Sequence, residues 1–131
     1  RLAVENVWKN KVFLAKFQSC ILHEGKLYGS DQNALVCADF LTGKELWRVK
    51  KIRNGTLVLV DGHLVMQRES GELEIGKASA EGWSPGTKAE ILSDRCWSVP
   101  VIHRGKLYTR SIDRVVCFDL SAKGATTQGG K

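Results

Sequence analysis

The 131-residue sequence predicts an all-β fold built from repeated four-stranded units. The first observation is an internal repeat, because "ILHEGKLYGSDQNALVCADFLTG" (21–43) recurs as "VIHRGKLYTRSIDRVVCFDLSAKG" (101–124). The second is that residues rich in Val, Ile, Leu and Tyr alternate or cluster in short runs, as they do in strands. The third is a dipeptide ending in glycine between the first two runs of each unit, which suits a tight hairpin.

The size of the repeat predicts the architecture. A looser copy, "LVLVDGHLVMQRESGELEIGKAS" (57–79), lies between the two close copies. Gly25, Gly62 and Gly105 occupy the same place in the three copies, with steps of 37 and 43 residues. Four antiparallel strands in about 40 residues is the size of one β-propeller blade. We therefore predict a β-propeller fragment of about two and a half to three four-stranded antiparallel blades.

Turn residues and apolar runs assign the elements in order. In the first full unit, "EG", "DQN" and "TG" separate four strands, the last of which is "KELWRVK". The segment before this unit contains Trp8, which lies 39 residues before Trp47 of "KELWRVK" and therefore predicts an outer strand of a preceding blade. The predicted partial propeller of residues 1–120 thus comprises that outer strand (3–13), a blade (18–53), a second blade (55–95) and an incomplete blade (97–120), followed by a small, polar, flexible tail (121–131).

A fragment of this kind leaves two blade faces without neighbours. Propeller rings contain roughly four to eight blades, so 131 residues at about 40 per blade do not close a ring. Exposed strand edges and apolar sheet faces favour pairing with further strands. We expect the ring to be completed by missing blades of a longer chain or by self-association, and a protein partner is a further possibility.

The charge and composition narrow the classes of partner. The net charge is +6, and the densest basic run is "RVKKIR" (48–53). We interpret this run as a solvated strand end, because no aromatic residues interleave with it to stack nucleic-acid bases. No apolar run approaches the ~20 residues of a membrane-spanning helix. Neither specific nucleic-acid binding nor a membrane span is therefore expected.

The cysteines and histidines are explained by the repeat. Cys37 and Cys117 occupy equivalent third-strand positions one whole blade apart, so we expect both to be free and buried. His23 and His103 recur two residues before the hairpin glycine, which favours a structural role over catalysis or metal binding. The aspartates fall mostly at turns and form no calcium-loop motif. We predict no catalytic, cofactor-binding or metal-binding residue in this chain.

The stretch "ADFLTGKELW" (38–47) carries a resemblance to a known family. It resembles the repeat signature of β-propellers of the pyrroloquinoline-quinone (PQQ) type, in which Ala, Asp, Thr-Gly-Lys and Trp recur at fixed spacing. In that family it is called a tryptophan-docking motif, because its Trp packs on the next blade. The resemblance covers residues 5–120 and implies C-terminal blades. The predicted structural blade residues are Ala38, Asp39, Thr42, Gly43, Lys44, Trp47, Gly25, Gly62, Gly105 and Asp119.

The resemblance implies two alternative functions. The family includes quinone-dependent dehydrogenases, which hold the quinone and usually a calcium ion, and it includes a scaffold of outer-membrane protein assembly. This chain lacks the adjacent cysteines found in several of the dehydrogenases. We expect a non-catalytic scaffold, with a fragment of a PQQ-dependent dehydrogenase as the alternative; PQQ and calcium are expected only under that alternative. The resemblance also implies a periplasmic or otherwise exported protein.

One tryptophan is a candidate contact for a partner. Trp83 lies in the polar segment "EGWSPG", where a large aromatic side chain is unusual. The alternative is that its ring folds back over its own blade. Both interpretations remain open on the sequence.

Overall fold

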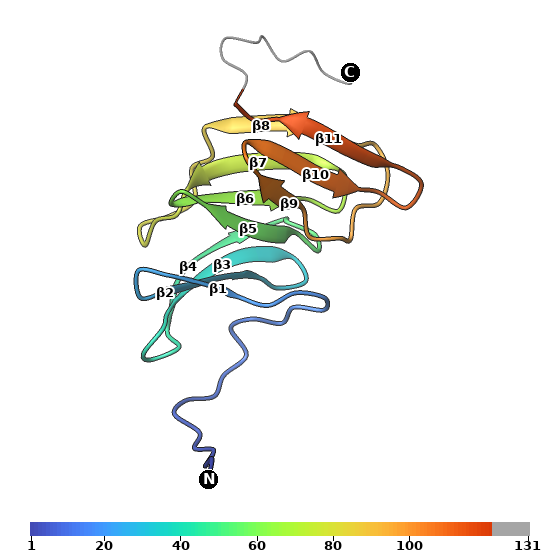
Figure 1. Ribbon diagram of the computed structural model, residues 1–131. Coiled ribbons are helices and arrows are strands. Elements are labelled where there is room, and N and C mark those ends of the chain that lie inside the picture. The colour runs from blue at the N-terminus through green and yellow to red at the C-terminus, as the bar shows by residue number, and fades with distance from the viewer. Residues whose placement is uncertain (122–131) are drawn as a thin grey trace.

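The computed structural model describes residues 1–121 and contains three antiparallel sheets stacked face to face (Figure 1). This arrangement confirms the predicted all-β propeller fragment. No helix occurs among the described residues, and so none is long and apolar enough to cross a membrane. The first sheet comprises β1 (Ile21–His23), β2 (Lys26–Ser30), β3 (Ala34–Asp39) and β4 (Glu45–Lys50); the second comprises β5 (Thr56–Val60), β6 (His63–Gln67), β7 (Glu72–Lys77) and β8 (Thr87–Glu90); the third comprises β9 (Val101–His103), β10 (Lys106–Arg110) and β11 (Val115–Asp119).

The first hairpin of each sheet has the same backbone conformation. Gly25, Gly62 and Gly105 have φ of 72°, 73° and 74°. The residues before them also have positive φ, between 47° and 48°. Two consecutive positive φ values match the twist of the flanking strands, which is why such two-residue turns are preferred in hairpins. Three nearly identical turns therefore set the pairing of β1 with β2, β5 with β6 and β9 with β10.

The alternating pattern of the strands builds two apolar layers. We call the interface between the first and second sheets the first seam, and that between the second and third sheets the second seam. The first seam contains the larger buried cluster: Tyr28, Leu35, Cys37, Ile52, Leu57, Leu64 and Met66. The second seam contains Val65, Leu73 and Leu107, with Ile75, Ile91, Ile102 and Phe118 packed around them. Because β6 contributes to both clusters, the second sheet is covered on both faces.

Residues 3–13 contain no strand, although the sequence predicts one there. A strand forms only beside a partner strand, and a preceding blade that could supply the partner is not among the described residues. Instead, this segment continues toward the outer face of the first sheet, where Phe13 lies against Gly29 and Trp8 lies against Gly43. Its N-terminal end extends away from the stack (Figure 1). Of the predicted flexible tail, residues 122–131 lie outside the described part of the chain.

Candidate functional site: the open face of the third sheet

The first seam shows what a blade face looks like when another blade covers it. Tyr28 is only 2% exposed, and Leu35 and Cys37 are completely buried. Burial raises the pKa of Tyr28 to about 12 and that of Cys37 to about 11, because the charged forms lose their hydration. The seam therefore holds both side chains in their neutral, apolar-like forms.

Trp47 extends across the first seam from the outer strand β4. Its indole N–H donates a hydrogen bond to the carbonyl oxygen of Ser79, at 2.9 Å, just beyond β7 of the second sheet. Its ring centroid lies 6.2 Å from that of Tyr28, a favourable spacing for tilted rings. Trp8 makes the corresponding bond to the carbonyl of Phe40, at 3.0 Å, just beyond β3 of the first sheet. Trp47 thus joins the first sheet to the second, and Trp8 joins the N-terminal segment to the first sheet.

The third sheet presents the same kind of face, and no other sheet covers it within residues 1–121. Val101, Tyr108, Val115 and Cys117, which we call the open face, match Ile21, Tyr28, Leu35 and Cys37 of the first sheet in the repeat and in strand register. Tyr108 is 43% exposed where Tyr28 is 2% exposed, and Val115 is 75% exposed where Leu35 is buried. Contiguous apolar surface of this kind is typical of an interaction site.

The open face overturns the prediction for one cysteine. Cys117 was expected to be buried like Cys37, but its side chain is exposed. The strand position is equivalent, so the difference comes from the absence of a covering sheet among the described residues. All four cysteines are free, which agrees with the expectation that Cys37 and Cys117 do not form a disulfide with each other.

The predicted motif residues of "ADFLTGKELW" form a turn beside the seam. One Asp39 carboxylate oxygen accepts hydrogen bonds from the backbone N–H groups of Leu41 and Thr42 and from the Thr42 hydroxyl. The Thr42 backbone bond is the largest contribution that lowers the pKa of Asp39. Gly43 takes a φ of 73° and lies so close to Trp8 that a Cβ would be 2.6 Å from its ring. The neighbours Ala38 and Lys44 are respectively buried and exposed.

Asp119 repeats this arrangement at the end of the third sheet. Lys106 donates to its carboxylate at 2.6 Å, and Ser121 donates from both its backbone N–H and its hydroxyl. These bonds, with that of Lys106 first, hold the pKa of Asp119 well below its usual range. The two aspartates therefore close turns, and their hydrogen-bonding capacity is used within the fold.

Trp83 folds over its own blade. Its indole N–H donates to Glu74 at 2.8 Å, and its ring lies against Gly76, where a Cβ would be 3.0 Å from it. Glu74 is only 1% exposed and also accepts two hydrogen bonds from Arg68. Burial acts to raise the pKa of Glu74, but the hydrogen bonds from Trp83 and Arg68 outweigh it, so the pKa is lowered. The ring thus folds back over its own blade, and a role for the half-buried Trp83 as a partner contact stays a prediction.

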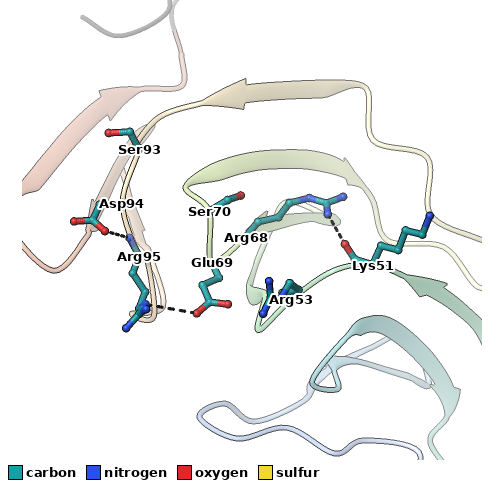
Figure 2. A pocket seen from close by; sticks show the side chains of 8 residues that line it. All are labelled: Lys51, Arg53, Arg68, Glu69, Ser70, Ser93, Asp94 and Arg95. Carbon is teal, nitrogen blue, oxygen red and sulfur yellow. Dashed lines mark hydrogen bonds and ion pairs between the residues drawn. The ribbon is translucent and has the colours of Figure 1, made fainter.

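A cavity of about 470 Å³ lies among the loops that connect β4 with β5, β6 with β7 and β8 with β9 (Figure 2). Figure 2 shows Glu69 flanked by Arg53 and Arg95. Glu69 accepts a hydrogen bond from the Trp97 indole at 2.7 Å, which is the main reason its pKa is lowered. No sequence motif predicted this cavity, although the run "RVKKIR" supplies part of its lining. Its lining residues are Lys51, Arg53, Arg68, Glu69, Ser70, Ser93, Asp94 and Arg95.

The histidines occupy the hairpin positions that the repeat assigns to them. His23 and His103 end β1 and β9 in the same register, and His23 lies 3.9 Å from the Glu24 carboxylate. Within residues 1–121, no three His, Cys, Asp or Glu side chains gather in a group that could hold a metal ion.

Comparison with known proteins supports the fold. No protein-family model matches the sequence, and no curated protein matches it. Among solved structures, the chain is similar to BamB from Moraxella catarrhalis, with 20% identity and a TM-score of 0.61 over 81% of this chain and 34% of BamB. It is also similar to the computationally designed proteins Ika4 (10% identity, TM-score 0.68, 90% of this chain and 74% of Ika4) and Ika8 (12%, 0.60, 82% and 36%). The chain therefore spans about a third of the length of BamB, and its three sheets have the fold of a β-propeller fragment.

Proposed function

We propose that the chain is a non-catalytic β-propeller module that acts as a structural and protein-interaction scaffold through the open face. The observation that carries the proposal is the contrast between Tyr108 and Tyr28. The same side chain, in the same strand register, is buried at the first seam and 43% exposed on the third sheet. A face whose residues match a covered blade face is suited to receive another sheet.

We further propose that the chain belongs to the PQQ-like repeat family. This membership is supported by the turn at Asp39, Thr42 and Gly43 and by the hydrogen bond of Trp47 across the first seam. An exported location is proposed with it, on the same resemblance. PQQ and calcium belong only to the alternative function as a dehydrogenase fragment. Dye reduction with alcohols or sugars after addition of PQQ and Ca²⁺ to the chain would contradict the non-catalytic proposal.

The test of the scaffold function is association through the open face. Sedimentation velocity of the 131-residue chain over a range of concentrations is expected to show association. Tyr108→Asp places a charge at the centre of the open face and is expected to weaken association by about tenfold or more, because a charge buried at an interface loses its hydration. Thr87→Asp is the matched control, since Thr87 lies exposed on the outer strand β8 of the second sheet. Its association is expected to match that of the unmodified chain.

Two results would contradict the proposal. One is a chain that remains monomeric at every concentration. The other is equal weakening by Tyr108→Asp and Thr87→Asp, which would mean that added negative charge alone causes the effect. Circular dichroism of each variant verifies that the strands remain folded.

A further inference from the structure

Residues 6–11 have the sequence of an outer strand. They read Asn-Val-Trp-Lys-Asn-Lys and lie 39 residues before β4, which reads Glu-Leu-Trp-Arg-Val-Lys. Trp8 and Lys11 thus correspond to Trp47 and Lys50. Among the described residues, however, segment 6–11 has no strand partner, and Val7 is 83% exposed. Within residues 1–121, no backbone–backbone hydrogen bond engages segment 6–11, so its N–H and C=O groups are available for pairing with another strand.

Trp8 holds this segment in the place of an outer strand. Trp47 belongs to β4 of one sheet and donates to a carbonyl beyond the third strand of the next sheet. Trp8 donates in the same way to the carbonyl of Phe40, which follows the third strand of the first sheet. Asn10 adds a second bond, from its side-chain amide to the carbonyl of Gly43 at 2.7 Å. The backbone around Trp8 therefore lies beside the first sheet as β4 lies beside the second.

The third sheet lacks a fourth, outer strand within the described part of the chain. Its order is β11-β10-β9, so the outer edge of β11 has no partner within residues 1–121, whereas β3 pairs with β4. An unpaired edge presents a row of free backbone N–H and C=O groups to another strand. In the first sheet, Cys37 is opposite Trp47 and Leu35 is opposite Val49. Transferred through the repeat, this register places Trp8 opposite Cys117 and Asn10 opposite Val115.

We propose that residues 6–11 of a second copy of this chain form the fourth strand of the third sheet. In that register, Trp8 of the second copy lies beside Tyr108, as Trp47 lies beside Tyr28. The first sheet of the second copy then covers the open face; Leu22, on the outer side of that sheet, is 53% exposed. This inference rests on the proposed scaffold function and names the partner of the open face.

The contact joins opposite ends of the molecule. Segment 6–11 leaves the first sheet at one end of the stack, and β11 lies at the other end (Figure 1). The arrangement is therefore head-to-tail, a contact between two different surfaces, which forms a closed ring if the rotation between copies allows it. Backbone pairing supplies the attraction, and Trp8 beside Tyr108 supplies the specificity, as in other cases of strand addition.

A disulfide trap tests the predicted register. Two chains are prepared in a Cys20→Ser/Cys117→Ser background, one with Asn10→Cys and the other with Val115→Cys. Mixed in oxidised glutathione, they are expected to form a cross-linked species of twice the 14.5 kDa chain mass, seen by non-reducing electrophoresis. The control replaces Val115→Cys with Thr87→Cys, on the outer strand of the complete second sheet, and is expected to give no cross-link above background. Equal cross-linking in both mixtures would overturn the proposal.

A pair of proline variants tests the strand itself. Asn6→Pro/Val7→Pro removes two backbone donors from the exposed segment and is expected to weaken association by about tenfold or more. Leu2→Pro/Ala3→Pro is the matched control, because both positions lie in the same exposed segment but outside the proposed strand 6–11. Association that is sensitive to Tyr108→Asp but not to Asn6→Pro/Val7→Pro would overturn this inference and leave the scaffold function standing. Association that is weakened by neither Tyr108→Asp nor Asn6→Pro/Val7→Pro would contradict the scaffold function as well.

Discussion

The two seams of this molecule are built from the same repeat but are held together by different chemistry. The first seam is joined by aromatic side chains, with Trp47 beside Tyr28. At the second seam, the position of Trp47 is occupied by Thr87, which pairs with Ile75 as Trp47 pairs with Cys37. A tryptophan at the outer strand is therefore not required for two blades to pack.

Buried polar side chains join the second seam instead. The Thr109 hydroxyl donates to the side-chain carbonyl of Gln67, and both residues are almost completely buried. The Gln67 amide and the Thr56 hydroxyl both donate to the carbonyl of Ser98, each at 3.5 Å. Such a network specifies one packing arrangement, because each group would be left without a partner in another. The first seam thus contains the larger apolar cluster, whereas buried side-chain hydrogen bonds supplement the smaller apolar cluster of the second seam.

The largest expected effect is at the first seam. Trp47→Ala removes the indole and its bond to Ser79, and it is expected to lower the free energy of unfolding by about 3 kcal/mol, as truncation of a packed aromatic does. Urea denaturation followed by circular dichroism measures this change. Thr87→Ala, at the equivalent place in the second sheet, is the control and is expected to change the unfolding free energy by less than about 0.5 kcal/mol. Similar losses for both variants would remove the distinction between the seams.

The second seam is expected to be destabilised when one partner of its buried hydrogen bond between Thr109 and Gln67 is removed. Gln67→Leu leaves the Thr109 hydroxyl buried without an acceptor and is expected to lower the unfolding free energy by about 2 kcal/mol. The double variant Gln67→Leu/Thr109→Val replaces both partners by apolar groups and is expected to recover most of that loss. Urea denaturation of the single and double variants measures both values. No recovery in the double variant would mean that shape, rather than hydrogen bonding, secures this seam.

The smallest expected effect is a pH dependence at the first seam, where Glu74 is buried. Because the pKa of Glu74 is lower in the folded state than in the unfolded state, its ionised form stabilises the fold above the ordinary carboxyl pKa. That contribution is lost as the pH falls through the folded-state pKa. Glu74→Gln is therefore expected to be less stable than the unmodified chain by about 1 kcal/mol at neutral pH, and the difference should shrink below the usual carboxyl pKa of about 4.3. Urea titrations at several pH values check this, and a constant difference would contradict it.

The repeat made much of the fold predictable. Hairpin glycines, alternating apolar positions and the turn at Asp39 are local signals, because a few neighbouring residues determine each of them. The same locality explains the correct fold class. Segment 3–13 differs because a strand depends on a partner strand, and its sequence resembles β4 without containing that partner.

The site was less predictable, because burial depends on residues distant in sequence. Cys117 shares its local pattern with Cys37, and only the presence or absence of a covering sheet separates the exposed thiol from the buried one. The environment of Trp83 depends on Glu74, nine residues away, which is bound in turn by Arg68. The cavity near Glu69 brings together three separate loops, and no single stretch of sequence contains its pattern.

The second sheet, covered on both faces, has a consequence for local opening. In a stack where each unit touches only its neighbours, the free energy of opening is set by the number of interfaces that each unit keeps. The middle sheet loses two interfaces when it opens, whereas the third sheet loses only the second seam. We therefore expect the strands of the third sheet to open before those of the middle sheet. The proposed partner surface thus lies on a sheet that is less firmly held than the middle one, and a bound partner would restore the missing interface at that end of the stack.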